Sequence, residues 1–241
     1  MPTAIVTGAS RGLGLAVAFG LAGQGWSLVI DARHDEPLSR AAGSLRGLLR
    51  PGAGLRSLAG DVTGGDHIAR LVAAAQELGD LELIVNNASS LGPSPLPALT
   101  DYPLAGFQAV LQTNAVAPLA LIQAAATQLD RAARPRVVNI TSDASVEPYE
   151  GWGGYGASKA ALDHMGSVLG VERPGWRVWT VDPGDLRTQM HQDAFPGEDI
   201  SDRPEPDSVV PAFLALIDSD RPSGRLRLSD VGVLEKAGGA S

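Results

Sequence analysis

A short apolar run, a glycine-rich turn and an apolar helical pattern follow one another at the start of the chain. Ala4 to Val6 favours a β-strand, and Thr7 to Gly14 has the sequence T-G-A-S-R-G-L-G. Glycines in such a turn permit a tight bend and let the backbone approach a phosphate closely. The helix predicted over Leu13 to Leu21 would direct free N–H groups and its positive dipole end at that phosphate. We predict a dinucleotide-binding unit here, although a plain turn between a strand and a helix has the same glycines.

Segments with strand character alternate with helical patterns along the rest of the chain, which is typical of a parallel sheet covered by helices. We predict a single-domain, doubly wound α/β fold of the Rossmann type over residues 1–241. It has a mainly parallel seven-stranded sheet, helices on both faces and a flexible tail over about 231–241. The later predicted strands are Ser27–Asp31, Leu55–Ala59, Leu83–Val85, Arg136–Ile140, Arg177–Val181 and Gly224–Leu228. The later predicted helices cover residues 38–49, 66–78, 107–129, 153–171 and 207–217.

The composition argues against several classes of protein. The net charge is −8 and there is no basic run, which disfavours a nucleic-acid surface. Cysteine is absent and the 4 histidines show no metal-ligand spacing, so we expect no thiol nucleophile and no metal site. Met1 leads directly into a strand without a secretory signal, and no apolar run reaches a membrane-spanning length. We expect a cytoplasmic protein with no nucleic-acid or membrane partner.

The segment from Ser142 to Lys159 contains the candidate chemistry. Tyr155 and Lys159 are four residues apart, so on a helix their side chains share one face. An ammonium beside a phenol stabilises the phenolate, which is expected to lower the pKa of Tyr155 towards that of an acid/base catalyst. Ser142 would add a hydroxyl donor for a substrate oxygen. A pair of this spacing also arises by chance on helix surfaces, so the segment alone does not establish catalysis.

The end of the second predicted strand bears on the type of cofactor. A carboxylate at this place binds a ribose 2′-OH, whereas an arginine accommodates a 2′-phosphate. Asp31 favours NAD, but the position that usually carries the discriminating acid is Ala32, and Arg33 follows it. Arg11 in the glycine turn could bind the same phosphate by charge-assisted contacts. We favour NADP(H), with the alternative that both arginines are solvated and Asp31 points inward.

Polar residues follow other strands or lie in the helices between them. Asp61 could meet an adenine amino group or simply open the next loop, and Asn86 with Asn87 could join neighbouring loops by hydrogen bonds. Asn114, four residues before Pro118, needs partners if it is buried, and its surroundings could hold a water. Because ligands bind outside the carboxyl ends of parallel strands, we expect the strand-end residues to line one edge of the sheet.

Several motifs occur together, in one order, over residues 3–230. They are T-G-x-x-x-G-x-G at Thr7–Gly14, D-V at Asp61-Val62, N-N-A at Asn86–Ala88, Asn114, Ser142, Y-x-x-x-K at Tyr155–Lys159, and P-G at Pro183-Gly184 with Thr188. In this combination the chain resembles the short-chain dehydrogenase/reductase family. The resemblance implies a Rossmann fold, a nicotinamide cofactor, a small carbonyl or alcohol substrate and a homodimer or homotetramer.

The resemblance also implies a role for each motif residue. Tyr155 would be the acid in carbonyl reduction and the base in alcohol oxidation, while Lys159 would lower its pKa and hold the nicotinamide ribose. Ser142 would polarise the carbonyl oxygen, and Asn114 would position a water that links Lys159 to solvent. The implied cofactor contacts are Thr7, Gly8, Ser10, Arg11, Gly12, Leu13, Gly14, Arg33, Asp61, Val62, Asn87, Ala88, Ser89, Tyr155, Lys159, Pro183, Gly184, Leu186 and Thr188.

The chain departs from the family pattern at Ser89, where the usual N-N-A-G becomes N-N-A-S and a side chain enters near the cofactor. The segments N-N-A-S-S-L-G and P-G-D-L-R-T-Q-M-H-Q are similar to the sepiapterin-reductase-like branch, which uses NADPH on carbonyl compounds. His191 could bind substrate, but we expect it to be a mobile lid residue that faces solvent. The predicted substrate contacts are Ser142, Tyr149, Trp152, Tyr155, Asp185 and Met190.

We expect an NADP(H)-dependent oxidoreductase that interconverts a carbonyl compound and its alcohol. A dinucleotide-sensing or scaffold protein without chemistry is the alternative, although a pure sensor has no need of the complete set Asn114, Ser142, Tyr155 and Lys159. A sugar-nucleotide epimerase shares Y-x-x-x-K but has a tighter glycine motif and a larger C-terminal substrate region, and the chain has neither.

Overall fold

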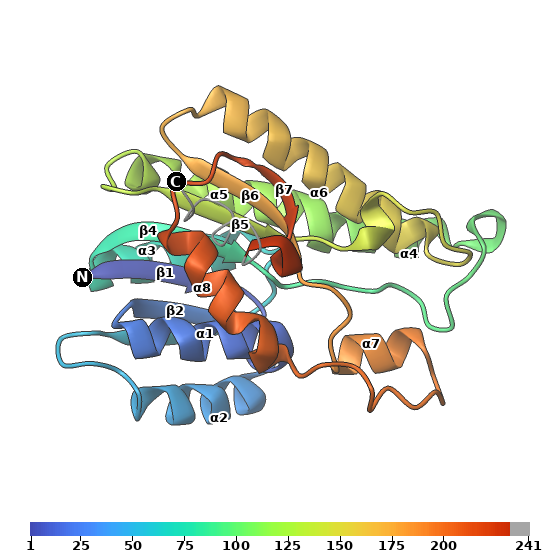
Figure 1. The fold of residues 1–241 in the computed structure, drawn as a ribbon, viewed down its shortest axis with the longest axis horizontal. Coiled ribbons are helices and arrows are strands. Elements are labelled where there is room, and N and C mark those ends of the chain that lie inside the picture. The colour runs from blue at the N-terminus through green and yellow to red at the C-terminus, as the bar shows by residue number, and fades with distance from the viewer. Residues whose placement is uncertain (232–241) are drawn as a thin grey trace, which may run out of the picture.

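A seven-stranded sheet forms the centre of the computed structural model, which describes residues 1–231 (Figure 1). The strands are β1 (Pro2–Val6), β2 (Ser27–Ala32), β3 (Leu55–Ala59), β4 (Asp80–Asn86), β5 (Arg136–Ile140), β6 (Arg177–Asp182) and β7 (Gly224–Arg227). Their order is β3-β2-β1-β4-β5-β6-β7, and every neighbouring pair is parallel. This confirms the predicted doubly wound α/β fold. The strand order reverses between β1 and β4, which is where such sheets bind their ligands.

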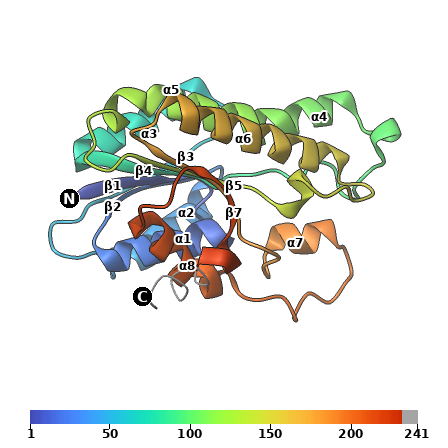
Figure 2. The same cartoon turned by 45° about the horizontal axis from the view of Figure 1, so that its top comes forward.

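Helices cover both faces of the sheet (Figure 2). One layer contains α1 (Gly12–Gln24), α2 (Asp35–Arg46) and α8 (Val210–Asp218). The other contains α3 (Gly65–Leu78), α4 (Leu104–Leu111), α5 (Ala117–Leu129) and α6 (Gly153–Glu172). The short α7 (Gln189–Ala194) stands apart from both layers. Of the tail predicted over about 231–241, Val231 is buried in the core, and the other residues lie outside the described part of the chain.

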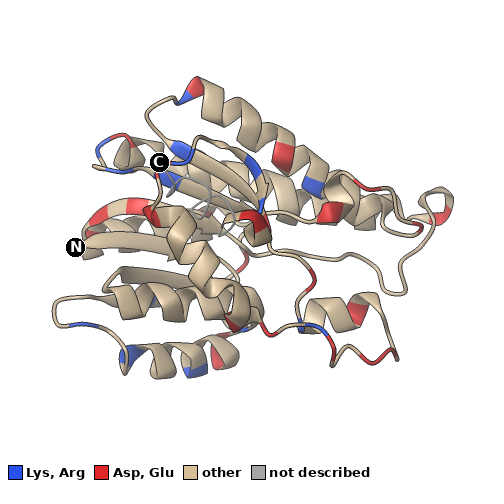
Figure 3. Ribbon diagram, in the orientation of Figure 1, with Lys and Arg blue, Asp and Glu red and all other residues tan. Residues whose placement is uncertain are grey.

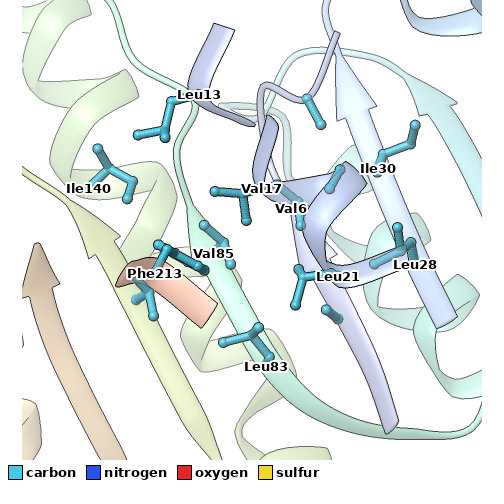
Figure 4. Close-up of a cluster of buried hydrophobic side chains, with 14 of the residues drawn as sticks. Val6, Leu13, Val17, Leu21, Leu28, Ile30, Leu83, Val85, Ile140 and Phe213 are labelled. Atoms are coloured by element: carbon cyan, nitrogen blue, oxygen red, sulfur yellow. The ribbon is translucent and has the colours of Figure 1, made fainter. Parts of the chain in front are cut away.

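Each face of the sheet has its own apolar core, because successive strand residues point to opposite faces and both faces are covered. Figure 4 shows the core under α1 and α8, where Val17 and Leu21 of α1 and Phe213 of α8 pack on Val6 and Val85. Ile5 lies between Ala4 and Val6, which belong to the first core, and is itself part of the second core under α3 and α5. The two cores hold the strands rigidly, so the loops at their carboxyl ends are fixed in position.

The predicted long helix is continuous from Leu104 to Leu129, with a π-helical turn at Gln112–Val116 between α4 and α5. By length and composition alone it could cross a membrane, because an 18-residue window has a mean hydropathy of 1.3. The expectation that no apolar run reaches this length is therefore wrong. About 44% of that window is buried inside the fold, as in a core helix. Its remaining apolar surface faces away from the sheet.

Candidate active site

The glycine turn after β1 and the N-N-A segment after β4 are joined by hydrogen bonds. The Thr7 hydroxyl accepts from the backbone amides of Asn87 and Ala88, both at 3.0 Å. The Asn87 side chain donates to the carbonyls of Thr7 at 2.8 Å and Gly8 at 3.2 Å. Asn86 is buried and donates to a side chain of the neighbouring β5. Asn86 and Asn87 thus connect neighbouring segments, and the glycine turn after β1 is fixed to the loop after β4, where the strand order reverses.

The glycine turn leaves space and donors for a phosphate group. Arg11 precedes α1 without capping it through its side chain, so the first N–H groups of the helix have no side-chain acceptor there. Gly12 has φ 57°, and a Cβ built on it would meet only Thr188, at 3.5 Å. A Cβ on Gly14 would lie 2.4 Å from the Asn87 amide nitrogen, so only glycine allows this packing. The turn therefore fits the pyrophosphate of a dinucleotide.

The carboxylate of Asp31, near the end of β2, is fully buried and points inward. One oxygen accepts a hydrogen bond from the Gly8 amide at 2.7 Å, and the other lies 3.0 Å from His67 Nε2. His67 Nδ1 is 3.1 Å from the Arg70 guanidinium, which can only donate, so the ring hydrogen is on Nε2 and is shared with Asp31. The structure therefore agrees with the inward alternative for Asp31. Ala32 follows it at the place usually held by the discriminating acid.

Positive charge surrounds the outer part of this strand end. Arg33 is exposed just beyond β2, and Arg11 is exposed in the glycine turn. The pKa of Asp61 is lowered mainly by hydrogen bonds from Thr63 and further by the charge of Arg33. The backbone amide and the hydroxyl of Thr63 both donate to the Asp61 carboxylate at 2.8 Å. Asp61 therefore fixes the start of the loop after β3, which was the second of its two predicted roles. Arg33 is therefore free to turn towards a bound anion.

Tyr155 and Lys159 are both buried on the inner side of α6. The ammonium lies 5.5 Å from the centre of the phenol ring and donates to the Ile140 carbonyl at 2.8 Å. Burial lowers the pKa of Lys159 to about 8. Burial also raises the pKa of Tyr155 well above its usual range, against hydrogen bonds from Ser89 and Ser142 that lower it. The pKa of Tyr155 thus moves opposite to the predicted direction, because desolvation outweighs the hydrogen bonding that lowers it.

Ser142 follows β5, and its side chain lowers the pKa of the Tyr155 phenol. Its hydroxyl donates to Asp143 at 2.9 Å and accepts from the Ala144 amide at 3.2 Å. The other Asp143 oxygen accepts from the Tyr149 hydroxyl at 3.0 Å. Asp143 belongs to no motif in the sequence, and its place directly after Ser142 is the one indication of its role. In this arrangement the Ser142 proton must turn away from Asp143 to reach a substrate.

Asn114 lies in the π-helical turn and is completely buried. Its amide nitrogen donates to the Ser90 carbonyl at 2.8 Å and the Ser158 hydroxyl at 2.9 Å. Its amide oxygen accepts from the Ser90 amide at 2.8 Å and the Ser89 hydroxyl at 3.1 Å. The side chain thus has a full set of protein partners. The backbone carbonyl is different, because residue 118 is proline and has no N–H to give the usual helical bond.

Aromatic and apolar side chains surround the other side of Tyr155. The Trp152 ring is 5.7 Å from the Tyr155 ring and 5.8 Å from Phe195, while Met190 packs on the same cluster. Phe195 also contacts His191 at 4.9 Å between ring centres, and the His191 side chain is only 11% exposed. The expectation of a solvent-facing His191 is therefore wrong, since α7 turns this ring inward. Among the other predicted substrate contacts, Tyr149 and Asp185 are exposed at the rim.

The segment after β6 completes the edge. Gly184 has φ 77° and donates its amide to Asp182 at 2.9 Å, which fixes the P-G turn. The Thr188 hydroxyl accepts from the His191 amide at 3.2 Å and begins α7. Leu186 is buried in the core under α1 and α8, so its side chain packs inside the protein and anchors the segment after the P-G turn. The other predicted cofactor contacts, which are buried or half-buried, are Ser10, Leu13, Val62, Ala88 and Pro183.

Comparisons with known proteins agree with this geometry. The family model described as short chain dehydrogenase matches residues 2–199. The chain is similar to the sepiapterin reductase of Rattus norvegicus, with 34% identity over 198 residues that cover 78% of this chain and 75% of the relative.

Solved structures show the same architecture over nearly the whole chain. A short chain dehydrogenase of Escherichia coli CFT073, complexed with NADPH, has a TM-score of 0.86 at 27% identity and covers 94% of this chain and 96% of its own. An alcohol dehydrogenase of the archaeon Thermococcus sibiricus, complexed with 5-hydroxy-NADP, has a TM-score of 0.83 at 26% identity and covers 94% and 95% of the two chains.

Proposed function

Since the chain belongs to the short-chain dehydrogenase/reductase family of NAD(P)-dependent oxidoreductases, we propose that it uses NADP(H) to interconvert a carbonyl compound and its alcohol. The observation that carries the proposal is the buried pair of Tyr155 and Lys159, with Ser142 beside it, at the edge that also holds the glycine turn. Both residues are buried and have strongly shifted pKa values, as is common among residues of acid/base chemistry.

Each residue of this set has a part in carbonyl reduction. The bound nicotinamide supplies the hydride in reduction and accepts it in oxidation. The Ser142 hydroxyl turns from Asp143 to the substrate oxygen and stabilises the negative charge that develops there. Tyr155 donates its phenolic proton to the same oxygen, and in oxidation its phenolate takes that proton back. Lys159 stabilises the phenolate by its charge and holds the nicotinamide ribose.

A proton must return to Tyr155 after each reduction. Lys159 is buried, so its exchange with solvent needs a relay through the protein. We assign this relay to a water held by Asn114, whose backbone carbonyl lacks the helical bond that Pro118 cannot give. The four side-chain hydrogen bonds of Asn114 keep this carbonyl in place.

The preference for NADP(H) rests on three residues. Asp31 is occupied inside the protein, so no carboxylate of β2 is left to bind a ribose 2′-OH. Arg33, just after β2, and Arg11, in the glycine turn, are both exposed, and guanidinium groups suit a 2′-phosphate. The two solved relatives that bind NADPH or an NADP derivative support the same choice.

The alternative is a sensor or scaffold that binds the dinucleotide without chemistry. A panel of carbonyl and alcohol compounds, followed by NADPH absorbance, separates the two. We expect turnover with at least one compound and a loss of at least about 10³-fold in Tyr155→Phe, because the phenolic proton has no substitute. Full activity in Tyr155→Phe would overturn the mechanism, whereas NADPH binding without any turnover would favour the sensor.

The substrate and the assembly belong to the same proposal. Trp152, Met190 and Phe195 belong to an apolar cluster at Tyr155, while Tyr149 and Asp185 are exposed, which suits a small carbonyl compound with polar substituents. The similarity to a sepiapterin reductase supports a reductase of that branch. We propose a homodimer or homotetramer formed through the helix Leu104–Leu129 and α6, working in the cytoplasm.

A further inference from the structure

Arg225 of β7 joins two segments of the candidate active site. Its Nε donates to the Asp163 carboxylate at 3.0 Å, and its Nη2 donates to the Ser142 carbonyl at 3.1 Å. Asp163 lies about two helical turns after Tyr155 in α6, and Ser142 lies just beyond β5. One guanidinium therefore connects the helix that carries the acid/base candidate to the backbone of the serine that would bind the same substrate oxygen.

The direction of the Arg225 side chain follows from the alternation of side chains along a strand. Leu226 packs against the core under α1 and α8, so Arg225 and Arg227 point to the opposite face of the sheet, where α6 lies. The Arg225 side chain is only 25% exposed. A guanidinium that is mostly withdrawn from water needs acceptors in the protein, and Arg225 finds them in the segments around the site.

Ser145 lies at the same junction between α6 and the segment after β5. Its hydroxyl oxygen is 2.7 Å from the Ser142 carbonyl and 2.6 Å from the Asp163 carboxylate. A hydroxyl has one proton, so Ser145 donates to only one of these two acceptors at a time. Arg225 has five N–H donors in a rigid plane and donates to both acceptors at once. The guanidinium is therefore the group that holds the two segments together.

A second carboxylate fixes the orientation of the guanidinium. One oxygen of Asp182, at the end of β6, lies 3.6 Å from Arg225 Nη2, and the other accepts from the Gly184 amide at 2.9 Å. The side chains of Asp163 and Asp182 are 13% and 5% exposed, so water screens these charges less than it screens a surface pair. Acceptors from the segment after β5, from α6 and from the end of β6 thus surround Arg225.

We propose that Arg225 is a positioning residue that sets the location of Ser142 relative to Tyr155, and the inference rests on the proposed function of these two residues. In carbonyl reduction the Ser142 hydroxyl and the Tyr155 phenol both meet one substrate oxygen, so the alignment of their segments affects the rate directly. A displacement of about 1 Å can cost about 10²-fold in rate. Arg225 acts through the Ser142 backbone and α6 and has no part in the chemical step itself.

The first test measures kcat and KM with a compound that the substrate panel shows to be turned over. Arg225→Gln should lower kcat by about 10- to 100-fold and change KM by less than about threefold, because the bond from Ser142 matters most in the transition state. Arg225→Lys keeps the positive charge and should restore the Tm but not kcat, since an ammonium does not reproduce the planar donors. Full recovery of kcat in Arg225→Lys would overturn the proposal.

A double-mutant cycle with Ser142→Ala separates positioning from general damage to the fold. Without the Ser142 hydroxyl there is no donor left to align, so Arg225→Gln should lower kcat by less than about threefold in that background. An equal loss with and without the hydroxyl would overturn the proposal. Arg227→Gln is the matched control, because it removes a guanidinium from the same face of β7 that, among the described residues, pairs with Asp182 alone. Its loss of kcat should stay below about threefold.

Hydrogen exchange followed by mass spectrometry gives a readout that needs no substrate. The Ser145 amide donates to the Ser142 carbonyl at 3.1 Å, and the Ala144 amide donates to the Ser142 hydroxyl at 3.2 Å. Both amides should exchange at least about fivefold faster in Arg225→Gln, because local opening costs less without the guanidinium, and at the wild-type rate in Arg227→Gln. Unchanged exchange in Arg225→Gln would overturn the proposal. Faster exchange in a protein that turns over no compound would reject the proposed function alone, and the link from Arg225 to Ser142 would stand.

Discussion

The carboxylate of Asp31 accepts a hydrogen bond from the backbone amide of Gly8 at 2.7 Å. This bond ties the end of β2 to the glycine turn after β1, and His67 fixes the other carboxylate oxygen from α3. The carboxylate at the end of the second strand therefore binds groups of the protein itself and not the ribose of the cofactor. A carboxylate that binds the protein and one that binds the ribose predict different cofactor affinities when the carboxylate is removed.

Asp31→Asn should weaken the binding of NADPH and NADH to the same extent, by about 3- to 10-fold. The amide would place an N–H against either the Gly8 N–H or the His67 Nε2–H, so one buried donor loses its acceptor at a cost of about 1–3 kcal/mol. Fluorescence titration with both cofactors and urea unfolding measure the two effects. Asp35→Asn, an exposed change at the start of α2, is the control. A selective change in NADH affinity would show that Asp31 contacts the ribose.

Arg33→Ala tests the preference for the phosphorylated cofactor. We expect a loss of NADPH affinity of about tenfold, because one charge-assisted hydrogen bond to the 2′-phosphate disappears. NADH has no such phosphate, so its affinity should stay the same. Arg46→Ala, which removes an exposed arginine in the last turn of α2, should change neither value. Equal affinity of the wild-type protein for both cofactors would refute the assignment.

Lys159→Met should abolish turnover and yet stabilise the ligand-free protein. Burial lowers the pKa of Lys159 from its usual 10.5 to about 8, so below pH 8 the folded protein carries a buried ammonium at a cost that methionine avoids. The gain is on the order of 1–3 kcal/mol, or about 5 °C in Tm. Between pH 8 and 10.5 the folded wild-type protein has released this proton while the unfolded chain keeps it. Wild-type stability from this group therefore rises with pH over that range.

The difference in Tm between Lys159→Met and wild type should accordingly be largest below pH 8 and shrink as the pH approaches 10.5. Calorimetry at several pH values measures it. Tyr155→Phe, which removes activity without removing a charge, is the control and should not show this pH dependence. A constant difference across the whole range would mean that Lys159 is not the titrating group.

The fold and the location of the site follow from the sequence because both depend on order along the chain. Alternating strands and helices allow few arrangements of a parallel sheet, and the strand ends then meet at one edge. Thr7, Asn87 and Ser142 could be placed there before their contacts were known, since each follows a strand directly.

The remaining features depend on burial and on contacts between distant segments. The pKa of Tyr155 moves opposite to the expected direction because burial of the phenol, which spacing does not reveal, raises it. The bond between Asp31 and His67 joins residues 36 positions apart, and a single carboxylate at a strand end gives no sign of it. His191 turns inward and packs on Phe195, a contact between α7 and the residue that follows it, which spacing along the chain does not reveal.

The outer faces of the long helix and α6 carry exposed apolar side chains. The segment Leu104–Leu129 has no charged residue, and Figure 3 shows α4 and α5 nearly free of charge. Val116 and Leu119 are exposed on this helix, while Val168 is exposed on α6. Such apolar surface on two neighbouring helices is typical of a contact between subunits.

We therefore expect light scattering to give at least a dimer for the wild-type protein. The double variant Val116→Glu, Leu119→Glu should raise the dissociation constant of the dimer by at least about tenfold, because charges would be buried in the interface without partners. Leu48→Glu, an equally exposed apolar position beyond α2, is the matched control and should leave the assembly intact. A monomeric wild-type protein would reject the interface, and a variant that stays dimeric would place the contact on another surface.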